Sequence, residues 1–201
     1  MGRDKTDTWF FFGDSVTLGV NDTECLGGFV SRLALLGAQK GLYELPPATF
    51  YNLGARRQKI AQIYDRFEAE YTARLMPGIC SRLAFCTGTV DTLSGTAHAD
   101  VENELSKLLG KAKTIAPTLF ICPPPAREEA VNQKLKLFNM LAQGICSSIN
   151  VPCVNIFDEL LEKGLPSLIT DAVHPGPDGN ALIARTLFDK PAVRTFLTVS
   201  D

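Results

Sequence analysis

The sequence predicts an α/β protein in which helices cover both faces of a mostly parallel β-sheet. Short apolar runs typical of buried strands alternate with longer amphipathic stretches typical of helices. Gly or Pro residues follow most of the apolar runs, which marks the points where strands end. Strands that alternate with helices form βαβ crossovers, and these place the strands parallel to one another. We therefore expect a three-layer α/β/α sandwich with a five-stranded sheet.

The expected elements run in strict alternation along the chain and give a flavodoxin-like outline. No repeat of fixed period and no low-complexity linker interrupts them, so residues 1–201 are expected to form a single domain. We expect strands at residues 8–12, 49–53, 82–87, 118–122 and 151–157, and helices at residues 28–39, 58–75, 97–115, 128–149 and 178–187.

Charge and composition limit the partners of the protein. The formal net charge is -2, so neither nucleic acid nor an anionic membrane surface is expected as the main partner. The start of the chain is polar, and the apolar run at residues 9–12 is too short for a signal peptide or a membrane anchor. We therefore expect a cytoplasmic protein that acts on a small molecule.

The cysteines and histidines do not have the spacing of a metal site. The chain has six cysteines without a close CxxC pair, and only two histidines. Cys86, Cys122 and Cys153 lie in apolar, strand-like runs, which is typical of small buried side chains in a reducing compartment. No metal and no other cofactor is expected.

Gly13-Asp14-Ser15 directly follows the first predicted strand. Ser15 would lie just past the carboxyl end of that strand, which is the edge where open α/β sheets bind ligands. A helix that starts there directs backbone N–H groups at the reacting group, so Ser15 is a candidate nucleophile. The tripeptide alone is also ordinary turn chemistry, because all three residue types favour turns.

Asp171 and His174 supply the other groups that a serine nucleophile needs. Acyl transfer to serine requires a base for the hydroxyl proton and a carboxylate that orients the base. His98 has a helical setting and is expected on the surface of a helix, whereas His174 follows Asp171 by three residues in a turn-rich stretch. The alternative is a loop histidine near a helix-capping aspartate. Together with Ser15, the pair favours a catalytic triad.

With these residues identified, the chain resembles the SGNH family of serine hydrolases, also called GDSL esterases and lipases. The first motif of the family resembles residues 13–19 (GDSVTLG), and the second resembles residues 52–54 (NLG). Residues 88–91 (GTVD) lie where the third motif, GxND, is expected, and residues 171–174 (DAVH) resemble the last, DxxH. The four motifs occur in the family's order over nearly the whole chain.

The resemblance implies a role for each matched residue. Ser15 would be the nucleophile, His174 the base and Asp171 the residue that orients it. Asp14 and Asp91 would be structural supports, and the implied fold is the SGNH hydrolase fold.

The same resemblance implies an oxyanion hole with one donor missing. The N–H groups of Ser15 and Gly54 would hold the oxyanion, as acyl transfer requires. The family's third donor is an asparagine side chain, but Val90 stands there and cannot donate. Residues two apart in an extended segment share a face, so we expect the Thr92 hydroxyl to substitute for it. The alternative is that Thr92 only makes a local bond to the backbone.

The sequence therefore predicts a serine hydrolase that cleaves carboxylic esters or thioesters through an acyl-serine intermediate. O-acetylated sugars are a further substrate class within this chemistry. One rival is a non-catalytic or very slow binder on the same scaffold, with Val90 as the sign of lost turnover. Another is a nucleotide or flavin binder, although Asp14 would repel a phosphate at the first loop.

Four further residues are weaker candidates near the same edge. Arg56, Arg57 and Arg127 follow strand ends and are candidates for contacting an anionic part of a substrate, although solvated surface is the more common role of such residues. Cys25 is close to Ser15 in the chain but has no neighbouring basic residue, so we treat it as incidental.

Overall fold

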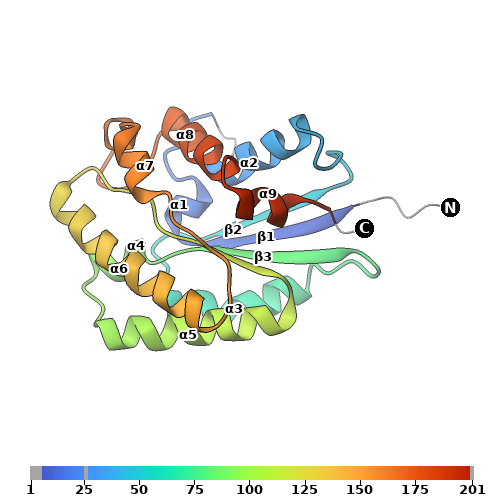
Figure 1. Cartoon of the computed structure of the whole chain (residues 1–201), viewed down its shortest axis with the longest axis horizontal. Helices are drawn as coiled ribbons and strands as arrows, with labels where there is room; N and C mark the ends of the chain where they lie inside the picture. Colours follow the sequence, from blue (N-terminus) through green and yellow to red (C-terminus); the bar gives the residue numbers. More distant parts are fainter. Residues whose placement is uncertain (1–5, 25–26, 200–201) are drawn as a thin grey trace.

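Five parallel strands form the centre of the computed structural model, which describes residues 6–24 and 27–199 (Figure 1). The strand order is β2-β1-β3-β4-β5, and every neighbouring pair is parallel. This confirms the predicted α/β fold with a five-stranded parallel sheet, and the observed strand order is that of flavodoxin-like folds. Cys25 and the polar first five residues lie outside the described residues. The strands are β1 (Asp7–Gly13), β2 (Thr49–Gly54), β3 (Cys80–Cys86), β4 (Thr118–Ile121) and β5 (Cys153–Val154).

Helices cover both faces of the sheet and complete the three layers. Figure 1 shows α2, α8 and α9 on one side of the sheet and α3, α5 and α6 on the other. The helices are α1 (Ser15–Leu18), α2 (Gly28–Gln39), α3 (Ile60–Thr72), α4 (Thr89–Leu93), α5 (His98–Ile115), α6 (Glu129–Ser148), α7 (Phe157–Glu162), the 3₁₀ helix η1 (Leu165–Leu168), α8 (Pro177–Phe188) and α9 (Pro191–Leu197).

Strand β1 separates two hydrophobic cores. Trp9 and Phe11 point into the core that is formed with α2, α8 and α9. Phe10 and Phe12 point into the opposite core, formed with α3, α5 and α6. A strand that is buried on both faces needs apolar side chains at consecutive positions, which explains the unbroken apolar run at residues 9–12.

The last strand is shorter than the sequence predicted. We expected a strand over residues 151–157, but only Cys153–Val154 pairs with β4. Asn155 ends the strand, because its Oδ1 accepts the Phe157 N–H at 3.0 Å and Phe157 already begins α7. The apolar run therefore spans the end of a strand and the start of a helix. The unpredicted helices α1, α4, α7, η1 and α9 each have fewer than eight residues, too few for a readable helical period.

The carboxyl edge of the sheet brings together the loops that carry the candidate residues. From β1 the chain crosses first to β2 on one side and then to β3 on the other, so the end of β1 is a topological switch point. Gly13, the last residue of β1, pairs with Gly54 of β2 and with Cys86 of β3. Ser15 follows directly, in the position where open α/β sheets bind ligands.

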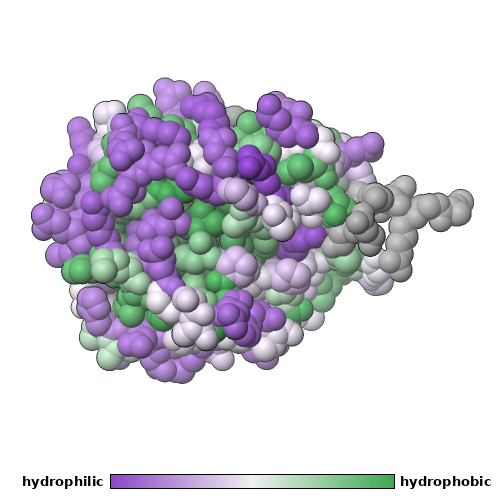
Figure 2. Space-filling model, in the orientation of Figure 1, coloured by the Kyte–Doolittle hydropathy of each residue, from purple (hydrophilic) through white to green (hydrophobic). Residues whose placement is uncertain are grey.

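The surface, the cysteines and the helices add three observations. Figure 2 shows hydrophilic residues around much of the rim of this face and hydrophobic residues reaching the surface toward its centre. Cys86 and Cys122 are buried as predicted, Cys153 is half-buried, and the described cysteines are free thiols. Among the described residues, no helix is both long enough and apolar enough to cross a membrane.

Gly13→Ala is expected to lower the free energy of unfolding by about 2–3 kcal/mol. A Cβ at Gly13 would lie 2.0 Å from Thr17 Oγ1 and 2.1 Å from the backbone oxygen of Cys86, which the sheet holds in place. The matched control is Gly110→Ala in α5, where an added Cβ meets no atom within 4 Å. We expect this control to raise the free energy of unfolding by about 0.5–1 kcal/mol. Urea titration followed by circular dichroism measures both, and equal effects would contradict the packing at β1.

Candidate active site

Three side chains from the two ends of the chain meet at the carboxyl edge of β1. Nε2 of His174 lies 2.8 Å from Ser15 Oγ, although 159 residues separate them in the chain. Nδ1 of the same ring lies 2.7 Å from Asp171 Oδ2. The structure thus brings together all three residues that the sequence singled out. The distances suit proton transfer from the serine hydroxyl to an imidazole that the carboxylate orients.

Ser15 is held at the first position of α1, a helix of one turn. Asp14 is its N-cap, and its Oδ1 accepts the Val16 N–H at 2.9 Å. Thr17 Oγ1 donates to the backbone oxygen of Cys86 at 2.9 Å, which ties α1 to β3. Gly19 ends the helix with φ 83°, a left-handed conformation that glycine adopts without strain. The contact of Asp14 suits the structural role that the sequence predicted for it.

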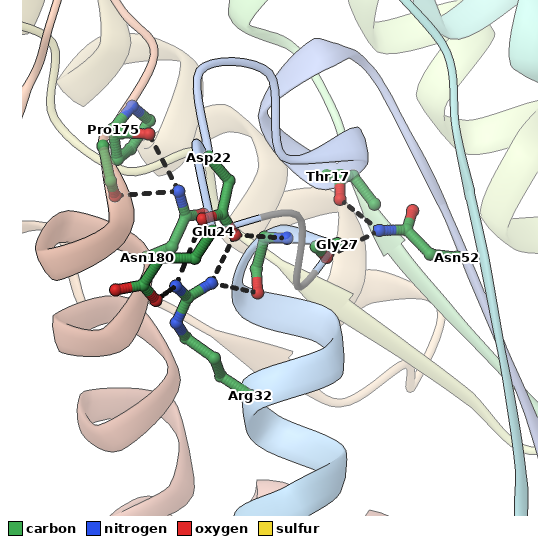
Figure 3. Close-up of polar contacts among 10 residues, drawn as sticks. Thr17, Asp22, Glu24, Gly27, Arg32, Asn52, Pro175 and Asn180 are labelled. Atoms are coloured by element: carbon green, nitrogen blue, oxygen red, sulfur yellow. Dashed lines mark hydrogen bonds and ion pairs between the residues drawn. The ribbon is translucent and has the colours of Figure 1, made fainter.

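Asn52 fastens α1 and the loop after it to strand β2 (Figure 3). Its Nδ2 donates to the backbone oxygens of Thr17 at 2.8 Å and Gly27 at 2.9 Å. Its Oδ1 accepts the Gly54 N–H at 3.1 Å. One amide side chain therefore sets the distance between the Ser15 helix and the end of β2.

An ion pair holds the loop between α1 and α2 (Figure 3). Arg32 of α2 pairs with Asp22 and, at 2.7 Å, with Glu24. Asp22 also accepts the Gly28 N–H at 3.0 Å. Burial alone would raise the pKa of Asp22, but the hydrogen bond and the charge of Arg32 hold it below its usual value. Asp22 and Glu24, which follow the Ser15 helix, are thus tied to the start of α2.

The loop at residues 169–176 presents His174 to Ser15. Asp171 Oδ1 accepts the N–H groups of Val173 and His174, both at 2.9 Å. Asn180 of α8 donates to the backbone oxygen of Pro175 at 2.8 Å, which anchors the loop (Figure 3). Burial raises the pKa of Asp171, but the bonds from the His174 ring and from the two N–H groups outweigh burial and hold it well below its usual range. Asp171 is therefore ionised at neutral pH.

Asn21 is a site residue that the sequence analysis missed. Its Nδ2 donates to Asp171 Oδ2 at 3.0 Å and to Thr170 Oγ1 at 2.9 Å. Its φ of 68° is left-handed, a conformation that Asn tolerates better than most residues. No motif links residue 21 to residue 171. The sequence shows only that an Asn follows the Ser15 motif in a loop, and this does not identify Asp171 as its partner.

The predicted oxyanion donors lie in different surroundings. The Ser15 N–H is in the first turn of α1, where N–H groups lack partners within the helix. Gly54 packs so close to α1 that a Cβ would lie 2.2 Å from the Leu18 nitrogen, so only glycine fits. Its N–H points to Asn52 Oδ1 in this structure.

The expected role of Thr92 depended on an extended segment, which the structure does not have at this position. We expected an extended segment after β3, but residues 89–93 form α4. Residues two apart in a helix do not share a face. The Thr92 hydroxyl donates instead to the backbone oxygen of Gly88 at 2.8 Å, which is the local bond that the alternative foresaw.

Two buried carboxyl groups support the site. Burial raises the pKa of Asp14 to about 6, although the Val16 N–H, the Thr89 side chain and the charge of His174 act in the opposite direction. Burial also raises the pKa of Asp91, whose Oδ2 accepts the Ile60 N–H at 3.2 Å at the start of α3. Asp91 thus fixes α4 against α3, as a structural support would.

The remaining candidates lie on the surface. Arg56, Arg57 and Arg127 are exposed, and the Arg127 N–H donates to the backbone oxygen of Ala172 beside Asp171 at 3.0 Å. Contact of these arginines with an anionic substrate stays a prediction. His98 is exposed at the start of α5, as expected. Within the described part of the chain, no group of three or more His, Cys, Asp or Glu residues is arranged to hold a metal ion.

Comparison with known proteins gives one family match. A profile of the family described as GDSL-like Lipase/Acylhydrolase matches residues 11–182, which is most of the chain. None of the curated protein sequences matches this chain.

Solved structures share the fold. A variant of Axe2, an acetyl xylan esterase from Geobacillus stearothermophilus, is 17% identical with a TM-score of 0.76, and 97% of each chain is covered. A member of the lipolytic protein G-D-S-L family from Veillonella parvula is 18% identical with a TM-score of 0.75, covering 92% of this chain and 98% of that chain. LAE5, an alpha/beta hydrolase enzyme from the metagenome of Lake Arreo, is 17% identical with a TM-score of 0.74, covering 95% and 96%. These likenesses confirm the predicted SGNH hydrolase fold.

Asp14→Asn is expected to change how stability depends on pH. The folded protein holds the Asp14 proton up to about pH 6, whereas the reference pKa is 3.8. The contribution of Asp14 to the free energy of unfolding should therefore fall by about 2–3 kcal/mol as the pH rises from about 4 to about 7. Asn keeps the capping oxygen but does not titrate, so the pH dependence of the variant should differ from that of the wild type by this contribution.

Urea unfolding at several pH values measures the decline. The exposed Asp178 provides the control, because Asp178→Asn should keep the wild-type slope. An identical slope in Asp14→Asn would show that folding does not raise the pKa of Asp14.

Proposed function

This chain belongs to the GDSL-like lipase/acylhydrolase family, and from that premise we propose that it is a serine esterase that cleaves carboxylic esters of small molecules. The observation that carries the proposal is the continuous line of contacts from Ser15 Oγ to His174 at 2.8 Å and from His174 to Asp171 at 2.7 Å. A chance arrangement of surface residues would not align both ring nitrogens with partners of the required chemistry.

The first half of the reaction acylates Ser15. Nε2 of His174 takes the hydroxyl proton while Oγ bonds to the carbonyl carbon of the ester, and the carbonyl oxygen becomes an oxyanion. Asp171 stabilises the imidazolium through the Nδ1–H bond. The imidazolium then gives its proton to the departing alkoxide as the carbon–oxygen bond breaks, which leaves an acyl-Ser15 ester.

The second half releases the acid. His174 removes a proton from a water molecule, the hydroxyl adds to the acyl carbon, and the proton returns to Ser15 Oγ as the acyl bond breaks. His174 serves as base and acid in both halves, so its orientation by Asp171 matters twice in each turnover.

Two backbone donors would hold the oxyanion. The Ser15 N–H is available at the start of α1, and the Gly54 N–H would have to share or exchange its present acceptor, Asn52 Oδ1. A role for Thr92 would likewise require its hydroxyl to leave the Gly88 oxygen. Since the loss of one donor typically costs about 10²–10³ in kcat, Val90 predicts a slower enzyme than one with a side-chain donor at that position.

The substrate class rests on chemistry shared by several esters. Thioesters and O-acetylated sugars present the same acyl carbon to Ser15, and the neighbour named as an acetyl xylan esterase supports the second class. We also propose that the protein is cytoplasmic and that its partner is a small-molecule ester and not a nucleic acid. The rival is a binder that lost turnover when a valine came to occupy position 90.

Ser15→Ala and His174→Gln should each lower kcat on p-nitrophenyl acetate by at least about 10³-fold, because they remove the nucleophile or the base. Ser15→Ala should also abolish labelling by a fluorophosphonate. The matched control is Ser167→Ala, which removes an exposed hydroxyl that bonds only to the backbone oxygen of Gly164. Wild-type protein that neither turns over the ester nor takes the label would support the rival binder.

Asn21→Ala is expected to reduce kcat about tenfold with little change in KM. The Asn21 side chain donates to Asp171 and Thr170, so its loss should disturb the orientation of the triad and not ground-state binding. Steady-state kinetics on p-nitrophenyl acetate measures both parameters. Asn103→Ala, an exposed change on α5, is the control, and a rise in KM alone would contradict a positioning role for Asn21.

A further inference from the structure

The segment that follows β4 is buried although it has no regular structure. Residues 122–126, the sequence CPPPA, are all buried and lie outside the helices and strands. A buried loop must still provide partners for its backbone N–H groups. The three prolines have no N–H, so only the backbones of Cys122 and Ala126 can donate. The Cys122 N–H bonds to the backbone oxygen of Val154 at 2.9 Å, which leaves Ala126 to be satisfied from elsewhere.

Asn132 provides partners for both backbone groups of Ala126. Its Oδ1 accepts the Ala126 N–H at 2.7 Å, and its Nδ2 donates to the Ala126 oxygen at 3.2 Å. Asn132 lies near the start of α6 and is only 2% exposed. An amide carries a donor and an acceptor, so this one side chain ties the loop after β4 to α6.

The next residue of the loop holds the catalytic loop. The Arg127 N–H donates to the backbone oxygen of Ala172 at 3.0 Å. Ala172 directly follows Asp171 in the loop at residues 169–176. The backbone that Asn132 fixes at Ala126 is thus one residue away from a direct bond to the loop that carries the triad.

A small hydrophobic cluster reinforces this junction. Val173, which directly precedes His174, packs with Ala126, with Leu135 of α6 and with Phe157 of α7. This cluster is separate from the two cores on either side of the sheet. Figure 1 accordingly shows the start of α6 on the same side of the molecule as α7. The residue beside His174 therefore rests on the loop that Asn132 holds.

A displacement of residues 172–173 would reach the triad directly. The N–H groups of Val173 and His174 both donate to Asp171 Oδ1 at 2.9 Å, while Asp171 Oδ2 faces Nδ1 of His174 at 2.7 Å. The backbone at this junction therefore orients the carboxylate that orients the imidazole. A misplacement of about 1 Å in an active site can cost about 10²-fold in rate.

We propose that Asn132 is a positioning residue of the active site. It fixes the loop after β4, and this loop in turn fixes the backbone at residues 172–173, which holds Asp171 against His174. This role rests on the proposed function. Asn132 acts through other residues, since its side chain bonds to the backbone of Ala126 and not to the triad.

Asn139 offers a matched comparison on the same helix. It follows Asn132 by seven residues, or about two turns of α6, and is 1% exposed. Its Nδ2 donates to the backbone oxygen of Pro123 at 3.2 Å. Pro123 adjoins Cys122, which β5 already holds, and it precedes Ala126 by three residues. Loss of the Asn139 bond should therefore destabilise the protein without moving the catalytic loop.

Kinetics on p-nitrophenyl acetate separates positioning from a merely structural role. Asn132→Leu removes both hydrogen bonds and keeps a side chain of similar size. Its kcat should fall about tenfold with KM within about twofold, because the orientation of the triad is disturbed and substrate binding is not. Asn139→Leu should keep kcat within about twofold of the wild type. Roles in stability alone would lower the urea midpoint of both variants and leave kcat of the folded protein unchanged in both.

Asn132→Asp serves if Asn132→Leu does not fold. The carboxylate still accepts the Ala126 N–H, but it has no donor for the Ala126 oxygen. One of the two bonds is kept, so kcat should fall only about threefold with KM unchanged. The matched control is Asn139→Asp, which should keep the wild-type kcat.

Nuclear magnetic resonance of the His174 ring follows the triad without turnover. The chain has only two histidines, so His174→Gln assigns the ring signals of a protein labelled with ¹⁵N and ¹³C. These signals depend on the contacts of Nδ1 and Nε2. They should change in the Asn132 variant, because Asp171 shifts against the ring, and they should match the wild type in the Asn139 variant.

The two measurements keep this role distinct from the proposed function. Wild-type turnover and labelling at Ser15, combined with unchanged kcat or unchanged His174 signals in the Asn132 variant, would reject only the role of Asn132. Equal losses of kcat in the Asn139 variant would reject it too. Absence of turnover and labelling in the wild type would reject the esterase. The ring signals then decide: a change confined to the Asn132 variant supports positioning, and unchanged signals overturn it.

Discussion

The contact between His174 and Ser15 is the constraint on which the rest of the site depends. It joins residues 159 positions apart, so it exists only if the sheet fixes one residue and the last loop fixes the other. Strand β1 fixes Ser15, because its side chains are buried in the two cores on either side of the sheet. Helix α8 fixes the loop of His174 through Asn180, and α8 packs against α2, the helix that follows the Ser15 loop. Packing far from the reacting atoms therefore sets a distance of 2.8 Å between them.

The same contact depends on polar groups that are only partly shielded from water. Asp171 is a half-exposed carboxylate, and its ionised form is kept by hydrogen bonds from the His174 ring, from backbone N–H groups and from Asn21. Asp14 is in the opposite situation, since burial favours its protonated form. The pKa values of two carboxyl groups near one imidazole are thus shifted in opposite directions, because one is solvated and hydrogen-bonded while the other is enclosed. Only the first can stabilise an imidazolium through a direct bond.

Much of the fold and the centre of the site could be predicted from the sequence because both leave local patterns. The apolar run at residues 9–12 indicated a strand buried on both faces, and the motif at Ser15 indicated the loop at its end. Asn21 could not be predicted, because its partner Asp171 is distant in the chain and only the folded loop brings them together. The conformation of the segment around Thr92 was predicted wrongly for a different reason. A segment of five residues is too short for its helical period to be read, so an extended conformation was assumed where α4 forms.

The most direct test of the account is a crystal structure of the protein after reaction with a fluorophosphonate. Phosphorus should be bonded to Ser15 Oγ, a phosphoryl oxygen should lie within hydrogen-bond distance of the Ser15 and Gly54 N–H groups, and His174 should still be bonded to Asp171. Phosphorus on another residue would contradict it. So would His174 turned away from both Ser15 and Asp171, since no base would then remain at the nucleophile.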